Sequence, residues 1–166
     1  MRQDIEEELR TWHHACSTWV EEKYKRRTMI RKYTILIADN NIHVRRFLVR
    51  ELSCPSYEII QAANHMQLFA RIFGEKTPDL IVFDMDIPYI NCLDVLKQIL
   101  NITPPIPVII YSYLSEYKDH PLVKSTQGFV EKNGNISTLQ NKISEVLNGY
   151  YENPGRSGQG HQDYLL

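Results

Sequence analysis

Five short apolar segments recur along the chain without the regular polar alternation of a half-exposed strand. They cover residues 35–38, 57–62, 80–83, 108–111 and 128–131. Continuous apolar runs of this length are typical of strands that are buried on both faces, which is the arrangement found in a parallel sheet. The pattern therefore predicts five parallel strands.

The segments between these runs show the period of an amphipathic helix. Their apolar residues recur at intervals of three and four positions. They are Val44, Phe47, Leu48 and Leu52; Met66, Phe69, Ala70 and Phe73; Leu93, Leu96 and Leu100; and Leu139, Ile143, Val146 and Leu147. Strands and helices thus alternate between about residues 33 and 148, which predicts an α/β fold built from right-handed crossovers.

Two of the expected helices carry further local signals. Asn135 or Ser137 would cap the last helix, and Gly149 would lie just past its end. The segment 113–127 has a poor helical pattern, and Pro121 would interrupt any long helix there. We therefore expect a weak fourth helix and a well-defined final helix.

The alternating region, residues 33–150, is flanked by a first segment at 1–32 and a tail at 151–166. The first segment is interpreted as one amphipathic helix, because its apolar residues are spaced by four and three positions. These are Ile5, Leu9, Trp12, Cys16 and Trp19. A seam of little more than two heptads fits both a helix folded back on the core and a helix that forms a homodimer. The tail is rich in Gly, Ser, Gln and Pro, so we expect it to be flexible.

Composition narrows the class of protein. The chain has 166 residues, a net charge of -1 and 43% hydrophobic residues, which fits one domain with a sizeable core and no general affinity for nucleic acid or membranes. No stretch reaches the ~18 apolar residues of a membrane span, and the acidic N-terminus is unlike a secretory signal. Three cysteines without C-x-x-C spacing favour a reducing compartment. We therefore expect a cytoplasmic protein.

Four of the predicted strands end at residues that can bind a phosphoryl group or a metal: Asp39, Asp84, Ser112 and Lys132. Because parallel strands place their carboxyl ends at one edge of the sheet, where open α/β folds have their sites, these side chains should converge. Each residue alone is more often a helix cap, a turn or a solvated surface group. Their occurrence together at four strand ends favours the chemistry of a phosphorylated aspartate.

The region from about residue 33 to 150 resembles the receiver domain of two-component response regulators. The resemblance rests on Asp39, the stretch 78–88 (PDLIVFDMDIP), Ser112 and the stretch 128–132 (GFVEK). It implies a doubly wound, flavodoxin-like fold with strand order 2-1-3-4-5. The C-terminal part of this region is similar to that of receivers of the NarL/FixJ class, which continue into a helix-turn-helix domain. Such a domain needs roughly sixty more residues, so DNA binding by this chain is not expected.

The resemblance also implies a role for each residue of the site. Asp84 would accept a phosphoryl group from a histidine kinase or a phosphotransfer protein. Lys132 would pair with Asp84 before transfer and with the phosphate afterwards. Ser112 would donate its hydroxyl to a phosphoryl oxygen, and Phe129 matches the aromatic residue that follows this hydroxyl inward. Output would come through a change in partner binding or dimerisation.

Magnesium is the cofactor that the family implies. It would be held by Asp39, Asn40, Asp84 and the backbone carbonyl of Asp86. Asn40 stands where receivers commonly supply a carboxylate, so metal binding should weaken rather than vanish.

Three further positions depart from the family pattern. Tyr113 follows Ser112 where a small residue is usual, Cys92 replaces a turn glycine, and Asn133 stands where many receivers have a cis-proline. A degenerate receiver that binds a partner without phosphorylation, through its fourth helix and fifth strand, therefore stays open as the alternative. An enzyme is not expected, because the sequence has no G-x-S-x-G elbow and no phosphate-binding loop.

Overall fold

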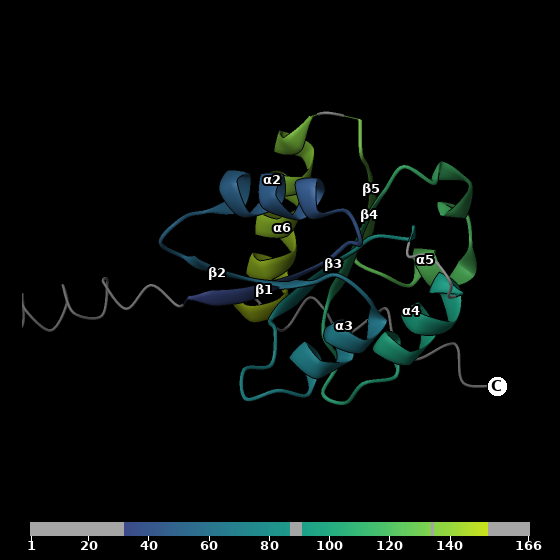
Figure 1. The fold of residues 1–166 in the computed structure, drawn as a ribbon, viewed down its shortest axis with the longest axis horizontal. Coiled ribbons are helices and arrows are strands. Elements are labelled where there is room, and N and C mark those ends of the chain that lie inside the picture. Colours follow the sequence, from purple (N-terminus) through teal and green to yellow (C-terminus); the bar gives the residue numbers. More distant parts are fainter. Residues whose placement is uncertain (1–31, 87–90, 134, 153–166) are drawn as a thin grey trace, which may run out of the picture. The chain divides into compact units, whose positions relative to one another are not determined.

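The fold is a five-stranded parallel sheet covered by helices. The computed structural model describes residues 32–86, 91–133 and 135–152. Its strands run in the spatial order β2-β1-β3-β4-β5, and every pair of neighbours is parallel (Figure 1). The strands are β1 (Tyr33–Ala38), β2 (Tyr57–Ala62), β3 (Leu80–Phe83), β4 (Val108–Ser112) and β5 (Gly128–Glu131). The predicted α/β fold and its strand order 2-1-3-4-5 are confirmed.

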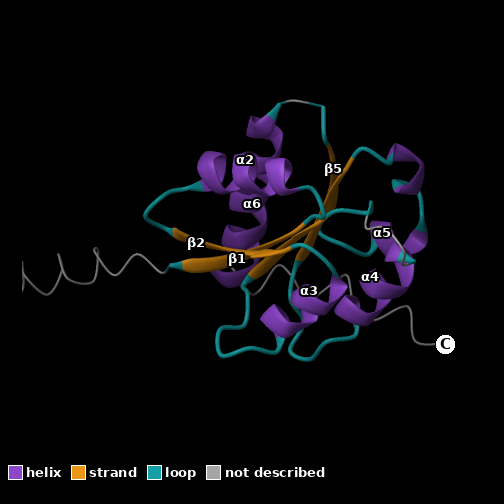
Figure 2. Ribbon diagram, viewed as in Figure 1, coloured by secondary structure: helices purple, strands orange, loops and turns teal. Residues whose placement is uncertain are grey.

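Helices cover both faces of this sheet (Figure 2). One face carries α2 (Ile42–Leu52) and α6 (Ile136–Leu147), and the other carries α3 (His65–Ile72), α4 (Cys92–Leu100) and α5 (Pro121–Lys124). A short 3-10 turn, Ser115–Tyr117, precedes α5, and a π-helical turn, Asn148–Glu152, follows α6.

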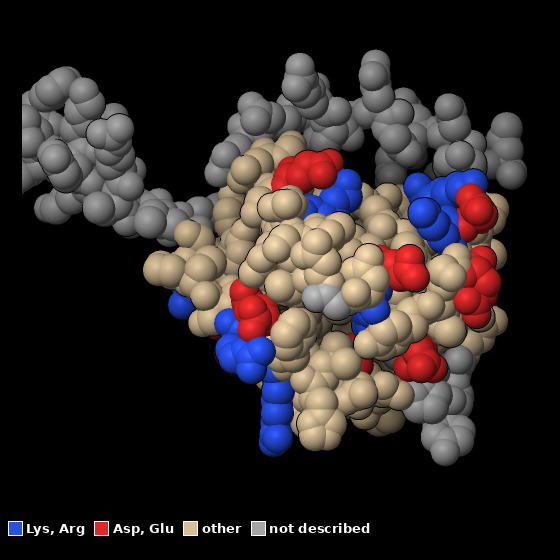
Figure 3. All heavy atoms as spheres, turned by 90° about the horizontal axis from the view of Figure 1, so that it is seen from above, with Lys and Arg blue, Asp and Glu red and all other residues tan. Residues whose placement is uncertain are grey.

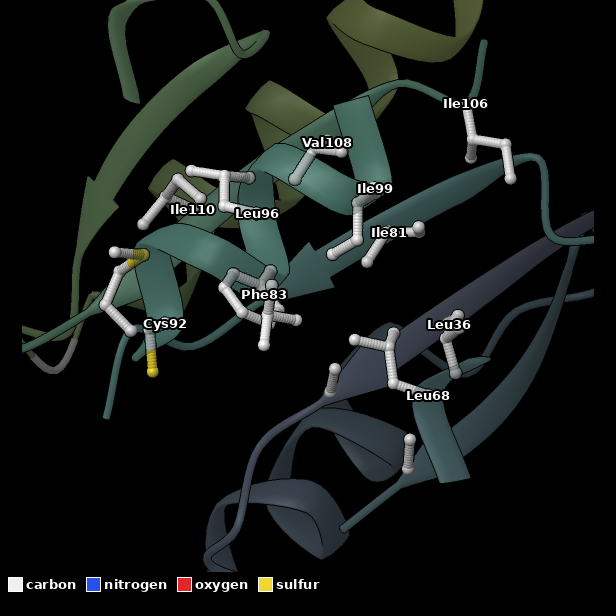
Figure 4. Close-up of a cluster of buried hydrophobic side chains, with 14 of the residues drawn as sticks. Leu36, Leu68, Ile81, Phe83, Cys92, Leu96, Ile99, Ile106, Val108 and Ile110 are labelled. Atoms are coloured by element: carbon white, nitrogen blue, oxygen red, sulfur yellow. The ribbon is translucent and has the colours of Figure 1, made fainter. Parts of the chain in front are cut away.

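The apolar core is divided by the sheet into two clusters. One cluster packs alternate residues of β1, β3 and β4 against α3 and α4, as Figure 4 shows for Leu36, Phe83 and Leu96. The other packs the intervening strand residues against α2 and α6. Each fully buried aliphatic side chain contributes about 1.5–3 kcal/mol relative to exposure, so strands buried on both faces hold the sheet between the helix layers.

β2 differs from the expectation for its apolar run. It is an edge strand, paired only with β1, and five of its six residues are partly exposed. Glu58 lies on it and forms an ion pair with Lys76. The polar residues in the sequence of this strand, Glu58 and Gln61, are the signal that separates it from the central strands.

Asparagine side chains begin four of the helices. Asn41, Asn64, Asn91 and Asn135 each accept a backbone N–H of the first turn at 2.9–3.1 Å. These bonds satisfy amide groups that have no partner inside the helix. Asn135 rather than Ser137 is therefore the cap of the last helix. Asp39 is not the cap of α2, which was the simplest alternative to a site role.

The prediction of which residues form the buried face of α3 is wrong. Leu68 and Ile72 are the buried residues of this helix, whereas Met66 and Phe73 are each 71% exposed. Phe69 is half-buried, and its ring stacks on that of Phe73 with 6.2 Å between the centroids. The residues chosen from the sequence thus form mostly the outward side of α3.

Two other local expectations concern the fourth helix and the last helix. The fourth helix is as weak as expected, with four residues, but Pro121 begins it rather than interrupting it. Proline suits this first position because its missing N–H would have no partner there in any case. Gly149 lies just past the end of α6, as expected, and the chain continues through it in a π-helical turn.

The π-helical turn is fixed against the edge of the sheet where the strands begin. The Tyr151 hydroxyl donates to the carbonyl of Asp79 at 3.0 Å, and the Tyr151 ring lies 5.6 Å from that of Tyr33. The Tyr150 hydroxyl donates to the carbonyl of Pro105 at 3.1 Å. These contacts hold Tyr151 beside the start of β1.

The surface of the described region carries charges of both signs. On the face shown in Figure 3, acidic and basic side chains are interspersed among uncharged residues. No helix among the described residues is both long and apolar enough to cross a membrane. The apolar seam at residues 1–32, the predicted tail at 151–166 and the domain borders based on them fall largely outside the described residues.

Candidate functional site

The site lies at the edge of the sheet where the strands end. Asp39 follows β1, Asp84 follows β3, Ser112 ends β4, and Lys132 follows β5. Backbone hydrogen bonds continue past the strands and fix these positions: the Asp84 amide donates to the carbonyl of Ala38 at 2.9 Å, and the Lys132 amide donates to the carbonyl of Ser112 at 3.0 Å. The predicted convergence of the four strand ends is therefore present.

Lys132 joins the two acids. Its Nζ lies 2.8 Å from Oδ2 of Asp39 and 2.6 Å from Oδ2 of Asp84. The three side chains are each at most 5% exposed. Two carboxylates and one ammonium therefore form a buried charged cluster, called the pocket below, that water hardly reaches and where an unpaired charge would be costly.

The ionisation of the pocket reflects this burial. Burial raises the pKa of the Asp39 carboxyl, and the hydrogen bond and charge of Lys132 only partly oppose the rise. Burial by itself lowers the pKa of Lys132, but its hydrogen bonds to Asp39 and Asp84 and their charges outweigh that effect and raise the pKa. The lysine is thus held in its charged form between the acids.

The other oxygens of the two carboxylates accept backbone amides. Oδ1 of Asp39 accepts the N–H of Asn41 at 2.7 Å, and Oδ1 of Asp84 accepts the N–H of Asp86 at 3.2 Å. These bonds fix the orientation of each carboxylate. Asn40 and Asp86 are both exposed at the rim, next to the acids that they would assist.

Arg45 is a residue of this site that the sequence analysis missed. Its side chain is almost buried, and Nη1 donates to the backbone carbonyls of Asp39 and Asn40 at 2.7 and 3.0 Å. The guanidinium therefore fixes the loop that carries both residues and adds a positive charge near the acids. Its spacing from Leu48 and Leu52, three and seven positions on, placed it on the buried side of the helix and could have revealed it.

Ser112 and Phe129 occupy different surroundings. Ser112 is fully buried, and its Oγ accepts the N–H of Leu114 at 3.2 Å, which leaves the hydroxyl hydrogen available for another oxygen. Phe129 is half-buried and packs against the cluster on the α3 and α4 side of the sheet. The structure thus brings Ser112 to the strand ends and places Phe129 in the neighbouring core.

Two tyrosine rings flank Lys132. Its Nζ lies 5.6 Å from the centre of the Tyr111 ring and 5.4 Å from that of Tyr113. Both distances fall within the range of cation–π attraction. Tyr111 is buried, whereas Tyr113 is 66% exposed. The sequence showed Tyr113 only as an unusual neighbour of Ser112 and did not indicate its contact with the lysine.

The donor set of the pocket fits magnesium. Mg²⁺ prefers oxygen ligands and is usually held by one or two carboxylates together with waters and phosphate oxygens. Asp39 and Asp84 supply two such carboxylates. Within the described ranges, no group of three or more His, Cys, Asp or Glu residues is arranged to hold a metal ion.

Comparison with known proteins decides the family. The family model for the response regulator receiver domain matches residues 35–144, which include β2 to β5, β1 from residue 35 onward and the four strand-end residues. The chain belongs to the response regulator receiver family. The receiver domain recognised from the sequence is thereby confirmed, whereas its assignment to the NarL/FixJ class stays a prediction.

Among curated relatives of this receiver, a protein-glutamate methylesterase/protein-glutamine glutaminase of Trichodesmium erythraeum is 33% identical over 86 residues. The match covers 51% of this chain and 24% of that protein. The receiver thus spans about a quarter of the length of that relative.

Solved structures share the fold of this receiver over nearly their whole length. The response regulator TrrA of Thermotoga maritima, in a complex with Mg²⁺ and BeF, has a TM-score of 0.63 and 25% identity, and the match covers 69% of this chain and 98% of that chain. A structure of the histidine kinase ThkA in complex with TrrA gives a TM-score of 0.63 and 26% identity, with the same coverage.

Proposed function

We propose that this receiver accepts a phosphoryl group on Asp84 from a histidine kinase or a phosphotransfer protein. The observation that carries the proposal is the buried ammonium of Lys132 between Asp39 and Asp84. A carboxylate held by a lysine at the strand ends of a receiver fold is positioned to act as a nucleophile towards phosphorus. The complex of the related regulator TrrA with a histidine kinase supports the proposed class of partner.

Each residue of the site has a part in this reaction. One oxygen of Asp84 forms a bond to phosphorus while the bond from phosphorus to the donor nitrogen breaks, and the electron pair of that bond leaves with the nitrogen. Lys132 then pairs with the phosphoryl oxygens that replace the carboxylate charge. Ser112 donates its free hydroxyl hydrogen to one of these oxygens, and Phe129 repacks behind it.

Magnesium would be held at this site by Asp39 and Asp84, with Asn40 and the backbone carbonyl of Asp86 as further oxygen donors. When bound, it supplies positive charge that neutralises the transferred phosphoryl group. Asn40 contributes an amide oxygen without a formal charge, so the site holds the ion less tightly than one with three carboxylates.

Phosphorylation by a small donor tests this proposal. Incubation with phosphoramidate and Mg²⁺ should add the mass of one phosphoryl group to the wild-type protein and none to Asp84→Asn. Asp94→Asn is the matched control, because Asp94 is an exposed acid in the first turn of α4. An unmodified wild type, or equal modification of Asp84→Asn, would reject the assignment.

The output of this receiver would be a change in the binding of a partner or in dimerisation. A homodimer through the apolar seam of residues 1–32 is the form that the sequence favours, and that seam lies outside the described residues. We assign no enzymatic step to the chain beyond the transfer of the phosphoryl group to itself.

A second function is favoured by the position of Asn40. The amide replaces a charged metal ligand at the exposed rim of the pocket, which fits a receiver that binds its partner without phosphorylation through the α5 and β5 side. In that case Asp84→Asn would bind the partner as tightly as the wild type, and addition of beryllofluoride with Mg²⁺ would not alter binding.

A further inference from the structure

We infer that Tyr113, together with Tyr111, holds the Lys132 ammonium at Asp84, and that Tyr113 is thereby a positioning residue for phosphoryl transfer. The first part concerns the structure of the pocket alone. The second part rests on the proposed function.

The inference begins with the donors of the lysine. An ammonium has three N–H donors. The Lys132 ammonium donates to Oδ2 of Asp39 and to Oδ2 of Asp84. The remaining contacts are with the rings of Tyr111 and Tyr113 at 5.6 and 5.4 Å. The negative faces of aromatic rings attract a cation without supplying a charge of their own, so the rings stabilise the ammonium without adding a third anion to a pocket that already holds two.

The surroundings of Lys132 make such positioning necessary. A lysine side chain is long and has several rotatable bonds, so it gives up much conformational freedom when one arrangement is fixed. If the transferred phosphoryl group is to meet a positive charge, the ammonium has to stay near Asp84 while the charges of the pocket change. The rings supply contacts that do not depend on those charges.

The two rings are not equivalent. Tyr111 is buried in the cluster formed with α2 and α6, so its replacement would also leave a cavity in the core. Tyr113 is 66% exposed and follows the end of β4. Its replacement removes one aromatic face from Lys132 with little loss of core packing, which makes it the residue to test.

A simpler interpretation of Tyr113 predicts the opposite effect on the rate of phosphorylation. In that interpretation the large side chain does nothing except obstruct the phosphodonor, so a smaller side chain would speed the reaction. If the ring positions Lys132, its loss slows the reaction even though access improves. The sign of the change therefore separates the two interpretations.

The test compares Tyr113→Leu with Tyr113→Phe in the full-length protein. Leucine removes the aromatic face, whereas phenylalanine keeps it and loses only the hydroxyl. Phe73→Leu is the matched control, because Phe73 is similarly exposed and directly follows α3, far along the chain from the residues of the pocket. All variants are first checked for an unchanged urea unfolding midpoint.

The first measurement is the NMR shift of the Lys132 Cε protons without a phosphodonor. We expect Tyr113→Leu to move this resonance downfield through loss of the ring current, while Tyr113→Phe and Phe73→Leu leave it unchanged. An unchanged resonance in Tyr113→Leu would overturn the contact. This outcome does not depend on whether the protein is ever phosphorylated.

The second measurement is the rate of phosphorylation by phosphoramidate with Mg²⁺. Tyr113→Leu should be about two- to fivefold slower, the range of one cation–π contact at an exposed site, and Tyr113→Phe should keep the wild-type rate. A Leu variant that is as fast as the wild type, or faster, would overturn the positioning role. A wild type that is never phosphorylated would defeat the proposed function and the positioning role with it, while the Lys132 resonance would still decide the contact.

Discussion

At the scale of single residues, the pocket contains more negative than positive groups. Asp39 and Asp84 present two carboxylates to one ammonium, that of Lys132. Arg45 adds its positive charge only through the backbone carbonyls of the loop. The pocket therefore has more negative than positive charge, which would favour a divalent cation. If Asn40 is a metal ligand, as we propose, its uncharged amide should limit how strongly that cation binds.

Restoring a carboxylate at position 40 should strengthen magnesium binding. We expect Asn40→Asp to tighten it about tenfold, which corresponds to ~1.4 kcal/mol and is a fraction of the ~4 kcal/mol gross attraction of one charge near a surface. Titration of amide resonances with Mg²⁺ measures the affinity.

The same substitution should lower the free energy of unfolding without metal, because it adds a like charge beside Asp39 and Asp84. Urea unfolding with and without Mg²⁺ would show this as a larger gain from the metal than in the wild type. An unchanged metal affinity would mean that residue 40 is not a ligand.

Removal of the Arg45 side-chain charge should loosen the loop of the pocket. Arg45→Met leaves the carbonyls of Asp39 and Asn40 without their donor, and hydrogen bonds that involve a charged group are worth about 1.5–3 kcal/mol each. We expect the free energy of unfolding to fall by about 2–3 kcal/mol, with faster hydrogen exchange at Asn41.

Arg46→Met is the control, because Arg46 is an exposed neighbour on the same helix. Its effect should stay within about 0.5 kcal/mol. Equal effects of the two substitutions would show that Arg45 has no special part in the loop.

The residues of the site were predictable to the extent that strand topology determines them. Asp39, Asp84, Ser112 and Lys132 could be placed together because parallel strands end at one edge. Strand topology does not place Arg45 or the two tyrosines. The spacing of Arg45 indicates only that it lies on the buried side of its helix. The atoms that Arg45 and the tyrosines contact depend on the direction of individual side chains, which the order of residues along the chain does not specify.

At the scale of elements, α3 shows where hydrophobic periodicity fails. Its segment contains two apolar stripes, one that includes Met66 and Phe73 and one formed by Leu68 and Ile72. Either stripe has helical spacing, and a helix of eight residues is too short for the pattern to distinguish them. The longer α6 has a single stripe, and its four predicted residues are all buried.

Substitution by alanine on the buried side and on the exposed side of α3 should have very different effects on the free energy of unfolding. Leu68→Ala removes a fully buried side chain and should lower the free energy of unfolding by about 2–5 kcal/mol. Met66→Ala, on the exposed side, should change it by less than about 0.5 kcal/mol. Urea denaturation monitored by circular dichroism gives both values, and a larger effect at Met66 would contradict the orientation of the helix.

At the scale of the whole molecule, the alternation of strands and helices was enough to predict an α/β fold with a parallel sheet, whereas the strand order came from the resemblance to receiver domains. Each central strand is a continuous apolar run, and each crossover brings the next strand parallel to the last. The burial of β2 was the exception, because its apolar residues suggested a strand buried on both faces whereas five of its six residues are partly exposed.

The oligomeric state also belongs to this scale. If residues 1–32 form a dimerising helix, deletion of residues 1–28 should convert a dimer into a monomer in light scattering, while circular dichroism shows the receiver still folded. A parent that is already monomeric, together with a truncated protein that unfolds at lower urea, would show instead that the segment stabilises its own chain.

The contact of Tyr151 with Tyr33 has a consequence for the connectivity of the fold. Its ring stands beside that of the first residue of β1, and its hydroxyl is fixed to Asp79. The first and last described segments of the receiver domain therefore lie close together. A circular permutant in which a short Gly-Ser linker joins residue 152 to residue 32, with new termini in the loop between α2 and β2, would keep every strand pairing and every residue of the pocket.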